Sequence, residues 1–370
     1  MFEQINLLVM PTDQCNMRCK YCFHGNSGYS KEIMDLEIFK KVILSIVDKW
    51  SRVQIVWHGG EPLCVPLEFY KEAYAFCEST DATFIYSLQT NATLLSQEKI
   101  DFFKDKHTKI GISYDGLTND YVRGNTSKIV ENIRKLKANG IEPGAIMVVT
   151  KKNVNNLLTE YKHYKELGLS WKLNPLFIDG SATQNLQLGL DVDEYSEKLY
   201  ELIKEWLYDR SCNINVQTCT DIVQLILTKK ARVCTYNSCL GKWFCINHKG
   251  DIYPCDRLYN PDFKLASIKD IETFSQVYDS PCFHSMLCDA IKRRNYCKDT
   301  CDIFEHCYGG CNANAYLGNG IAFVNNDTCK IHRYLIKSVK KEIQTALKFS
   351  EERLNPRFVK LLHTAKSNDF

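Results

Sequence analysis

Apolar and amphipathic stretches alternate through the first half of the chain. Short apolar runs predict buried parallel strands, at residues 5–10, 54–57, 84–88, 109–114, 145–150 and 171–177. Helical periodicity separates and follows these runs, at about residues 35–50, 67–78, 96–104, 126–139, 153–167 and 192–209. The pattern predicts an α/β fold, a partial (β/α)6 TIM-like barrel. In barrels of this kind the chemistry lies at the C-terminal ends of the strands.

The second half of the chain has a different pattern. From Cys234 to Cys329 the sequence is loop-rich and dense in cysteine, and helical periodicity returns only at about residues 330–347. We therefore expect residues 1–215 to form the barrel, 216–335 a small domain held together by metal, and 336–370 a C-terminal helical segment.

Composition narrows the class of protein. With 45% hydrophobic and 25% charged residues, the 370-residue chain has an ordinary globular balance, so general disorder is excluded. Its net charge is only +3, without a clustered basic stripe, and we expect no nucleic-acid partner. No apolar run reaches the length of about 18 residues that a membrane span needs. The first residues lack the basic region of a secretion signal, which indicates a cytoplasmic protein.

Cysteine is the unusual residue, with 18 in the chain. Disulfides are rare in a reducing compartment, and the chain is far longer than a small disulfide-stapled scaffold. Metal binding is the remaining explanation, so the division of the cysteines between sites decides the function.

Three cysteines follow the first predicted strand with the spacing C-x3-C-x2-C, namely Cys15, Cys19 and Cys22. Thiolates that lie this close in one loop can converge on one metal centre. Three ligands are one short of the set that closes a structural zinc site or an electron-transfer cluster, so one position is open to another ligand. A partial zinc site or chance clustering is the alternative, and the position of the loop in a barrel argues against it.

This loop resembles the signature of the radical S-adenosylmethionine (SAM) enzymes, C-x3-C-x-aromatic-C, with Tyr21 at the aromatic position. The resemblance implies that the three cysteines hold a 4Fe-4S cluster whose fourth iron binds SAM. It also implies reductive cleavage of SAM to a 5′-deoxyadenosyl radical, which takes a hydrogen atom from the substrate. Other strand ends fit, and the implied SAM-binding residues are Tyr21, Gly59, Gly60, Glu61, Asn91, Ser113 and Arg123. Without the resemblance, Gly59 and Gly60 would indicate an ordinary turn and Arg123 a surface charge.

Two further cysteine strings lie in the second half, Cys234-x4-Cys239-x10-Gly250-x4-Cys255 and Cys297-x3-Cys301-x5-Cys307-x3-Cys311, followed by Cys329. Eight thiolates can ligate two zinc ions or two 4Fe-4S clusters, and the spacing alone does not choose between them.

The strings resemble the SPASM extension of radical SAM enzymes that modify peptides and proteins, with three residues instead of two between Cys297 and Cys301. The resemblance implies two auxiliary 4Fe-4S clusters, the first held by Cys234, Cys239, Cys255 and Cys311. The second would be held by Cys297, Cys301, Cys307 and Cys329. The other cysteines are expected to be inert thiols, with Cys282 and Cys288 as spare ligands and Cys64 and Cys245 as candidates for a catalytic thiol.

The whole chain is similar to anaerobic sulfatase-maturating enzymes and to maturases of ribosomal peptides. In the sulfatase-maturating group an aspartate after Tyr-Pro-Cys is catalytic, which makes Asp256 a tentative base in Tyr253-Pro254-Cys255-Asp256. The alternative is that Asp256 caps a turn or pairs with Arg257.

We therefore expect a peptide or protein maturase that crosslinks or oxidises a residue of a ribosomally made precursor peptide. The chain starts almost at its first strand, so we expect no separate leader-recognition domain before the barrel. A flavodoxin- or ferredoxin-like electron donor is the expected partner. An anaerobic sulfatase-maturating enzyme that makes formylglycine from Cys or Ser is the alternative. From another class, a zinc-binding interaction protein would explain the eight C-terminal cysteines, but not the loop at Cys15–Cys22.

Overall fold

The fold comes from a computed structural model, which describes residues 4–25, 31–317 and 326–366. Its strands form one sheet in the order β6-β5-β4-β3-β2-β1-β7-β8-β9. The strands are β1 Gln4–Val9, β2 Arg52–Trp57, β3 Thr83–Thr90, β4 Lys109–Ser113, β5 Gly144–Val149, β6 Ser170–Pro175, β7 Trp243–Ile246, β8 Asp251–Tyr253 and β9 Ala266–Ser267. The six strands predicted from the apolar runs are all present and all parallel to their neighbours, as in a partial barrel.

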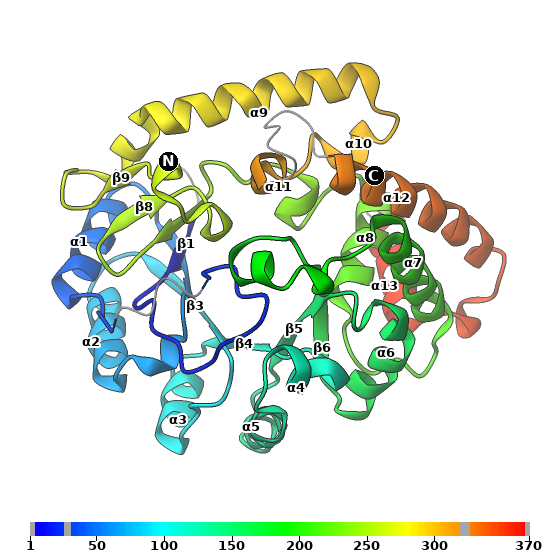
Figure 1. Ribbon diagram of the computed structural model, residues 1–370, viewed down its shortest axis with the longest axis horizontal. Helices are drawn as coiled ribbons and strands as arrows, with labels where there is room; N and C mark the ends of the chain where they lie inside the picture. The colour runs from blue at the N-terminus through cyan, green and yellow to red at the C-terminus, as the bar shows by residue number, and fades with distance from the viewer. Residues whose placement is uncertain (1–3, 26–30, 318–325, 367–370) are drawn as a thin grey trace.

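Helices surround this sheet and cover its outer face (Figure 1). They are α1 Leu36–Val47, α2 Leu67–Glu78, α3 Gln97–Asp105, α4 Asn119–Val122, α5 Thr126–Ala138, α6 Leu157–Glu166, α7 Val192–Tyr208, α8 Gln217–Thr228, α9 Pro281–Thr300, α10 Phe304–Cys307, α11 Asn312–Leu317, α12 Asn326–Ala346 and α13 Pro356–Lys366. The six helices predicted in the first half are found close to their expected positions. None of the described helices has the length and apolar character needed to cross a membrane.

The two faces of the barrel strands differ in chemistry. Side chains alternate along a strand, and Leu7 and Ile55, which are paired in register, are fully buried in the core that includes the outer helices. The opposite face carries amides: Gln4 Nε2 donates to Gln54 Oε1 at 3.4 Å. On the same face Gln89 Nε2 donates to Ser113 Oγ at 2.9 Å. The barrel therefore has an apolar outer layer and a polar inner face that leads to the C-terminal ends of the strands.

The C-terminal half continues the sheet, which the sequence analysis did not predict. Strand β7 pairs in parallel with the free edge of β1, with Leu8 opposite Cys245, and β8 and β9 follow it in antiparallel order. The strands are only two to four residues long, too short for a periodicity of two to show in the sequence. The hairpin places the segment after β8 beside the loop after β1.

The expectation of a loop-rich segment from Cys234 to Cys329 is wrong for residues 281–300. They form α9, a helix of 20 residues that crosses the top of the molecule in Figure 1. Only Phe283, Met286 and Arg293 are buried along it, so it lacks the regular apolar stripe that sequence analysis detects.

Helix α8 was also not predicted, and it packs against the barrel. Thr218 Oγ1 accepts a hydrogen bond from the β6 backbone at Leu173, and Trp171 bridges to Val216 just before the helix. Helices α12 and α13 pack in turn against α7 and α8. The divisions at residues 215 and 335 stay predictions.

Candidate active site at the C-terminal ends of the strands

Three thiols lie together in the loop that follows β1. Cys19 is buried and Cys15 and Cys22 are half-buried. Burial raises the pKa of Cys15 to about 12, and the charges of the other two thiols raise it further. Bound metal ions favour the thiolate form. Three neighbouring thiols that disfavour one another's charge are therefore suited to a cationic metal centre.

The turn after β2 is built against this loop. The N–H of Gly60 donates to Thr12 O at 3.1 Å, and the N–H of Glu61 donates to Gln14 O at 2.7 Å. A Cβ at Gly59, which has φ +110°, would lie 2.8 Å from Thr12 O, and one at Gly60 would collide with the Gln14 carbonyl. Both glycines are thus required for the close approach of two backbones. Their predicted contact with SAM stays a prediction.

Glu61 is fully buried, and its carboxylate connects the ends of β2 and β3. Its Oε1 accepts from Leu63 N at 3.0 Å and from Thr90 Oγ1 at 2.7 Å, and its Oε2 accepts from Asn91 N at 2.7 Å. Asn91 in turn donates from Nδ2 to Asn16 Oδ1 at 2.8 Å, within the cysteine loop. Burial raises the pKa of Glu61, although these hydrogen bonds favour its charged form. The predicted SAM residues Glu61 and Asn91 thus form one hydrogen-bonded unit with the loop.

A second buried unit joins the loop to β4. The Tyr21 hydroxyl donates to Asp115 Oδ2, and Arg123 Nη1 donates to the Tyr21 oxygen at 2.8 Å. Asp115 Oδ1 accepts from Val148 N at 2.7 Å. The charge of Arg123 also acts on Cys19, whose pKa burial nevertheless raises. Arg123 Nε is buried and has no hydrogen-bond partner among the described residues, so this N–H is available to a ligand.

Four of the C-terminal cysteines lie near one another, namely Cys234, Cys239, Cys255 and Cys311. Cys234 hydrogen bonds with Cys239 and Cys311, and the bond with Cys239 is the largest of the effects that raise its pKa to about 11. Cys311 also acts on Cys255, whose pKa rises mainly because of burial. These are the four residues that the resemblance assigns to the first auxiliary cluster.

The other four cysteines form a second group. Burial raises the pKa of Cys307 to about 12, with further contributions from the charges of Cys329, Cys301 and Cys297. These four cysteines line one pocket, and Arg293 and His332 line it too. The extra residue between Cys297 and Cys301 does not separate them, because α9 ends at residue 300 and Cys301 N donates back to Cys297 O at 2.9 Å.

In the ranges that the structure describes, no three His, Cys, Asp or Glu side chains are grouped closely enough to hold one metal ion.

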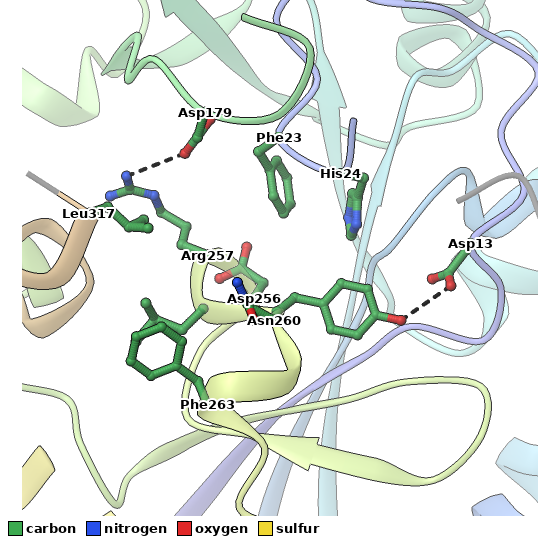
Figure 2. A pocket seen from close by; sticks show the side chains of 11 residues that line it. Asp13, Phe23, His24, Asp179, Asp256, Arg257, Asn260, Phe263 and Leu317 are labelled. Carbon is green, nitrogen blue, oxygen red and sulfur yellow. Dashed lines mark hydrogen bonds and ion pairs between the residues drawn. The ribbon is translucent and has the colours of Figure 1, made fainter. Parts of the chain in front are cut away.

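A cavity of ≈ 330 Å³ lies between the cysteine loop and the hairpin of β7 and β8 (Figure 2). Phe23 and His24, which follow Cys22, form one wall, and Asp256 and its neighbours in the 3-10 turn Asp256–Leu258 form another. Asp256 thus directly follows Cys255 and shares the cavity with Phe23 and His24, which follow Cys22. Its Oδ1 accepts from Cys255 Sγ at 3.1 Å. The alternative pairing of Asp256 with Arg257 is not seen, because Arg257 pairs with Asp179 at 3.8 Å.

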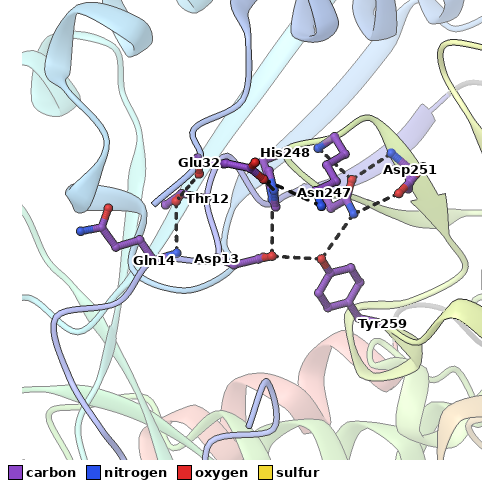
Figure 3. Close-up of polar contacts among 9 residues, drawn as sticks. Thr12, Asp13, Gln14, Glu32, Asn247, His248, Asp251 and Tyr259 are labelled. Carbon is purple, nitrogen blue, oxygen red and sulfur yellow. Dashed lines mark hydrogen bonds and ion pairs between the residues drawn. The ribbon is translucent and has the colours of Figure 1, made fainter. Parts of the chain in front are cut away.

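A polar network includes Asp13 and Tyr259, two residues of the cavity lining (Figure 3). The Tyr259 hydroxyl donates to Asp13 Oδ2 at 3.2 Å, and His248 Nδ1 lies 3.4 Å from the same oxygen. On its other side His248 Nε2 lies 3.1 Å from Glu32 Oε2. Asn247 Nδ2 donates to the Tyr259 oxygen at 3.3 Å. The network joins the loop after β1 to the hairpin, so the two walls of the cavity are held together.

Several residues of this cavity were not predicted from sequence. They are Asp13, Phe23, His24, Asp179, Arg257 and Tyr259. Asp13 and Asp179 both follow predicted strands, which is the one signal that pointed to them. The others depend on a contact between β1 and a hairpin that begins more than 200 residues later, and no local pattern indicates such a contact.

Comparison with known proteins agrees with this geometry. Residues 9–161 match the family model of the radical SAM superfamily, and this range contains the three-cysteine loop and β2 to β5. The chain carries a radical SAM domain. The radical SAM assignment from the cysteine spacing is thereby confirmed, and it implies SAM and a 4Fe-4S cluster as cofactors.

Several curated proteins that are similar to this chain are sulfatase-maturating enzymes. A cysteine-type anaerobic sulfatase-maturating enzyme of Clostridium novyi is 25% identical over 84% of this chain and 89% of its own. A serine-type anaerobic sulfatase-maturating enzyme of Bacteroides thetaiotaomicron is 26% identical over 82% of this chain and 81% of its own. Both types of relative are thus about equally similar.

Solved structures show the same fold. Native anSMEcpe with bound AdoMet and a Cp18Cys peptide has a TM-score of 0.82, with 22% identity, over 94% of this chain and 100% of that chain. Streptococcus suis SuiB bound to precursor peptide SuiA has a TM-score of 0.65, with 17% identity, over 89% of this chain and 76% of that chain. The predicted α/β fold with a partial barrel is confirmed.

Proposed function

We propose that this radical SAM enzyme is a maturase that abstracts hydrogen from a side chain of a ribosomally made precursor peptide and leaves a crosslinked or oxidised residue. The observation that supports it most is the cavity, because it adjoins the three-thiol loop and is lined by the side chains of two distant parts of the chain. Two structures of the same fold contain bound peptides.

In this proposal Cys15, Cys19 and Cys22 hold the 4Fe-4S cluster. The bound cluster and SAM supply the 5′-deoxyadenosyl radical. Gly59 and Gly60 allow the backbone to approach the cofactor closely, and Arg123 offers its free Nε–H to the SAM carboxylate, for which a guanidinium is well suited. Tyr21, Glu61, Asn91 and Ser113 complete the SAM-binding surface through the hydrogen bonds described above.

The other roles follow from the same proposal. Asp256 accepts the proton that the substrate loses, at a carboxylate that lines the cavity. The eight cysteines of the SPASM-like segment hold two auxiliary 4Fe-4S clusters, whose chemistry when bound is to accept electrons. We infer a flavodoxin- or ferredoxin-like protein as electron donor, and a cytoplasmic location.

Formylglycine formation is a second candidate, and two observations favour it. The curated relatives are sulfatase-maturating enzymes of both the cysteine and the serine type. Asp256 also lines the cavity, and it follows Tyr-Pro-Cys, as the resemblance implies for the catalytic aspartate of that group. The substrate would then be a Cys or Ser side chain of a sulfatase.

Metal content tests the cofactors. The protein is purified without oxygen and reconstituted, and iron and sulfide are counted beside a Cys15/Cys19/Cys22-to-Ala variant. We expect about 12 irons per chain, and about 8 in the variant, because one four-iron cluster is lost. A colourless protein with stoichiometric zinc would instead support the zinc-binding interaction protein.

Product analysis separates the two substrates. The reconstituted enzyme is given dithionite and SAM, and 5′-deoxyadenosine is measured by chromatography. Candidate precursor peptides encoded next to the gene, and peptides that span the active-site Cys or Ser of sulfatases, are then compared by mass spectrometry. An aldehyde that reacts with a hydrazine reagent identifies formylglycine, whereas loss of two hydrogens without an aldehyde identifies a crosslink. No 5′-deoxyadenosine from iron-loaded enzyme would contradict both.

A further inference from the structure

The lining of the cavity has more acidic than basic side chains. Its described residues include three carboxylates, Asp13, Asp179 and Asp256, together with one arginine, Arg257, and one histidine, His24.

The one arginine of the lining is paired inside the wall. Arg257 lies 3.8 Å from Asp179, donates from Nη1 to Asn314 Oδ1, and stacks over the ring of Phe177 at 4.0 Å. Its buried Nη2 has no hydrogen-bond partner among the described residues, so its contact with Asp179 is an ion pair without a hydrogen bond. The carboxylates of Asp13 and Asp256 are left without a matching cation in the cavity.

Both remaining carboxylates have unused hydrogen-bonding capacity. Asp13 Oδ1 is buried and has no hydrogen-bond partner among the described residues, while its Oδ2 accepts from Tyr259. The basic groups nearest to Asp13 are His248 and Lys249, and both also face Glu32. The Asp256 carboxylate accepts a hydrogen bond from the Cys255 thiol, which would be lost if that thiol became a metal-bound thiolate. A buried carboxylate oxygen without a donor is costly, and a donor from the substrate would remove this cost.

Aromatic rings form the rest of the lining. Phe23, Tyr259 and Phe263 line the same cavity as the carboxylates, and Figure 2 shows Asp256 between Phe23 and Phe263. Ammonium and guanidinium groups are attracted to the faces of such rings. The hydrocarbon stem of a lysine or arginine side chain also packs well against them.

We propose that this cavity receives a positively charged side chain of the substrate, lysine or arginine, between Asp13, Asp256 and the rings of Phe23, Tyr259 and Phe263. The inference rests on the proposed function, in which the substrate is a peptide or protein. None of the residues predicted to bind SAM lines the cavity, so its charge is directed at the second ligand. A volume of ≈ 330 Å³ is at the lower end of the range for ligand sites of about 300–1,000 Å³, and fits one long side chain.

Binding of a matched pair of probes tests the proposal. The acetylated and amidated pentapeptides Gly-Gly-Lys-Gly-Gly and Gly-Gly-norleucine-Gly-Gly differ only in the charged end of the central side chain. Each is equilibrated by anaerobic dialysis with the iron-loaded, SAM-bound enzyme. We expect the lysine peptide to bind at least about tenfold more tightly, as a charge-assisted contact with a carboxylate requires.

Variants of lining residues test whether the preference for the lysine peptide arises in the cavity. Asp13→Asn keeps the shape but removes one charge, and should reduce the preference for lysine about fivefold or more. Asp179→Asn releases Arg257 from its partner and should also weaken the lysine peptide without weakening the norleucine peptide. Asp262→Asn is the matched control, because Asp262 is an exposed aspartate of the same hairpin segment outside the cavity lining. Its preference should stay within about twofold of the wild type.

Equal binding of the two peptides to the wild-type enzyme would overturn the proposal, whether or not a variant folds. If the preference for the lysine peptide persists in both Asp13→Asn and Asp179→Asn, the lysine side chain does not bind in this cavity. The same preparations are assayed for 5′-deoxyadenosine with SAM and dithionite. Normal cleavage without a lysine preference rejects only the cation site, whereas failure of cleavage in iron-loaded enzyme rejects the proposed function.

Discussion

Glu160 shows how a single buried carboxyl supports the site without taking part in it. It lies on α6 beneath the end of β4, fully buried, and both its oxygens accept from Leu117 N at 3.2 and 3.1 Å. Gly116 has room for no side chain, because a Cβ there would collide with this carboxylate. Burial raises the pKa of Glu160 to about 7. The residue fixes the turn after β4, which carries Ser113 and Asp115 toward the cysteine loop.

The raised pKa predicts a pH dependence of stability. Below about pH 4.5 Glu160 is protonated in both the folded and the unfolded chain, so its contribution is complete. As the pH rises to about 7 only the unfolded chain loses the proton readily, so the free energy of unfolding falls, by roughly 2–3 kcal/mol from this group. Glu160→Gln should flatten this slope in urea unfolding at pH 5 to 8. An unchanged slope in the variant would show that another group is responsible.

At the same scale, the residues of the site fall into two groups: those that the sequence identifies and those that only the structure identifies. Cys15, Cys19, Cys22, Tyr21 and the Gly59–Glu61 turn were found because their spacing is local. Asp13, His24 and Tyr259 have no such spacing, and they matter only because the fold brings β8 beside the loop after β1. The hydrogen bonds of Glu61 with Leu63, Thr90 and Asn91 likewise cannot be predicted from the sequence, because they depend on how the strand ends are placed in the fold.

At the scale of elements, the turn after β2 and the cysteine loop form one packed unit. Gly60→Ala would insert a Cβ against the carbonyl oxygens of Asp13 and Gln14, and the loop must shift. We expect the variant to fold with a free energy of unfolding lower by about 1–3 kcal/mol, and to lose iron from the first site only. Iron counting and urea unfolding measure the two effects.

Gly144→Ala is the matched control for this substitution. Gly144 begins β5, has no positive φ, and a Cβ there would meet no atom within 4 Å. The control should keep the full iron content and a free energy of unfolding within about 0.5 kcal/mol of the wild type. Loss of iron in both variants would mean that the effect is not specific to the Gly60 contact.

The predicted elements were correct where each had a strong periodicity of its own. The six barrel strands are buried on the face toward the helices, and their flanking helices carry wide apolar stripes, so both were found from sequence. Helix α9 has few buried positions, and β7 to β9 are very short, so tertiary contacts rather than local pattern determine them. Long, regular elements were thus predictable, and the elements that close the cavity were not.

At the scale of the whole molecule, α12 connects the second cysteine group to the barrel. Cys329 lies in its first turn, and Glu342, four turns later, accepts from the hydroxyls of Tyr200 and Tyr208 on α7 at 2.7 Å each. Glu342→Ala leaves two tyrosine hydroxyls without their acceptor and should lower the free energy of unfolding by about 1–3 kcal/mol. Urea unfolding measures this loss.

Tyr200→Phe is the milder comparison, because Glu342 keeps its bond to Tyr208. It should cost no more than about 1.5 kcal/mol. Because a helix is a stiff rod, a loosened α12 should also make the metal at Cys329 easier to remove. Faster release of about four irons per chain to a chelator in Glu342→Ala alone would show this, and equal rates in both variants would contradict it.

Strand β1 pairs on one edge with β2 and on the other with β7, and Asn6 Nδ2 donates to Lys242 O across a sequence separation of 236 residues. On the ribosome the first pairing is possible long before the second. At about 5–20 residues per second, the strand waits roughly 12–47 seconds for its other neighbour. During this interval the wall of the cavity formed by Asp256 and its neighbours does not yet exist, and only the wall formed by Phe23 and His24 is present. A metal centre that assembles on the nascent chain would therefore meet the loop after β1 before the cavity is closed.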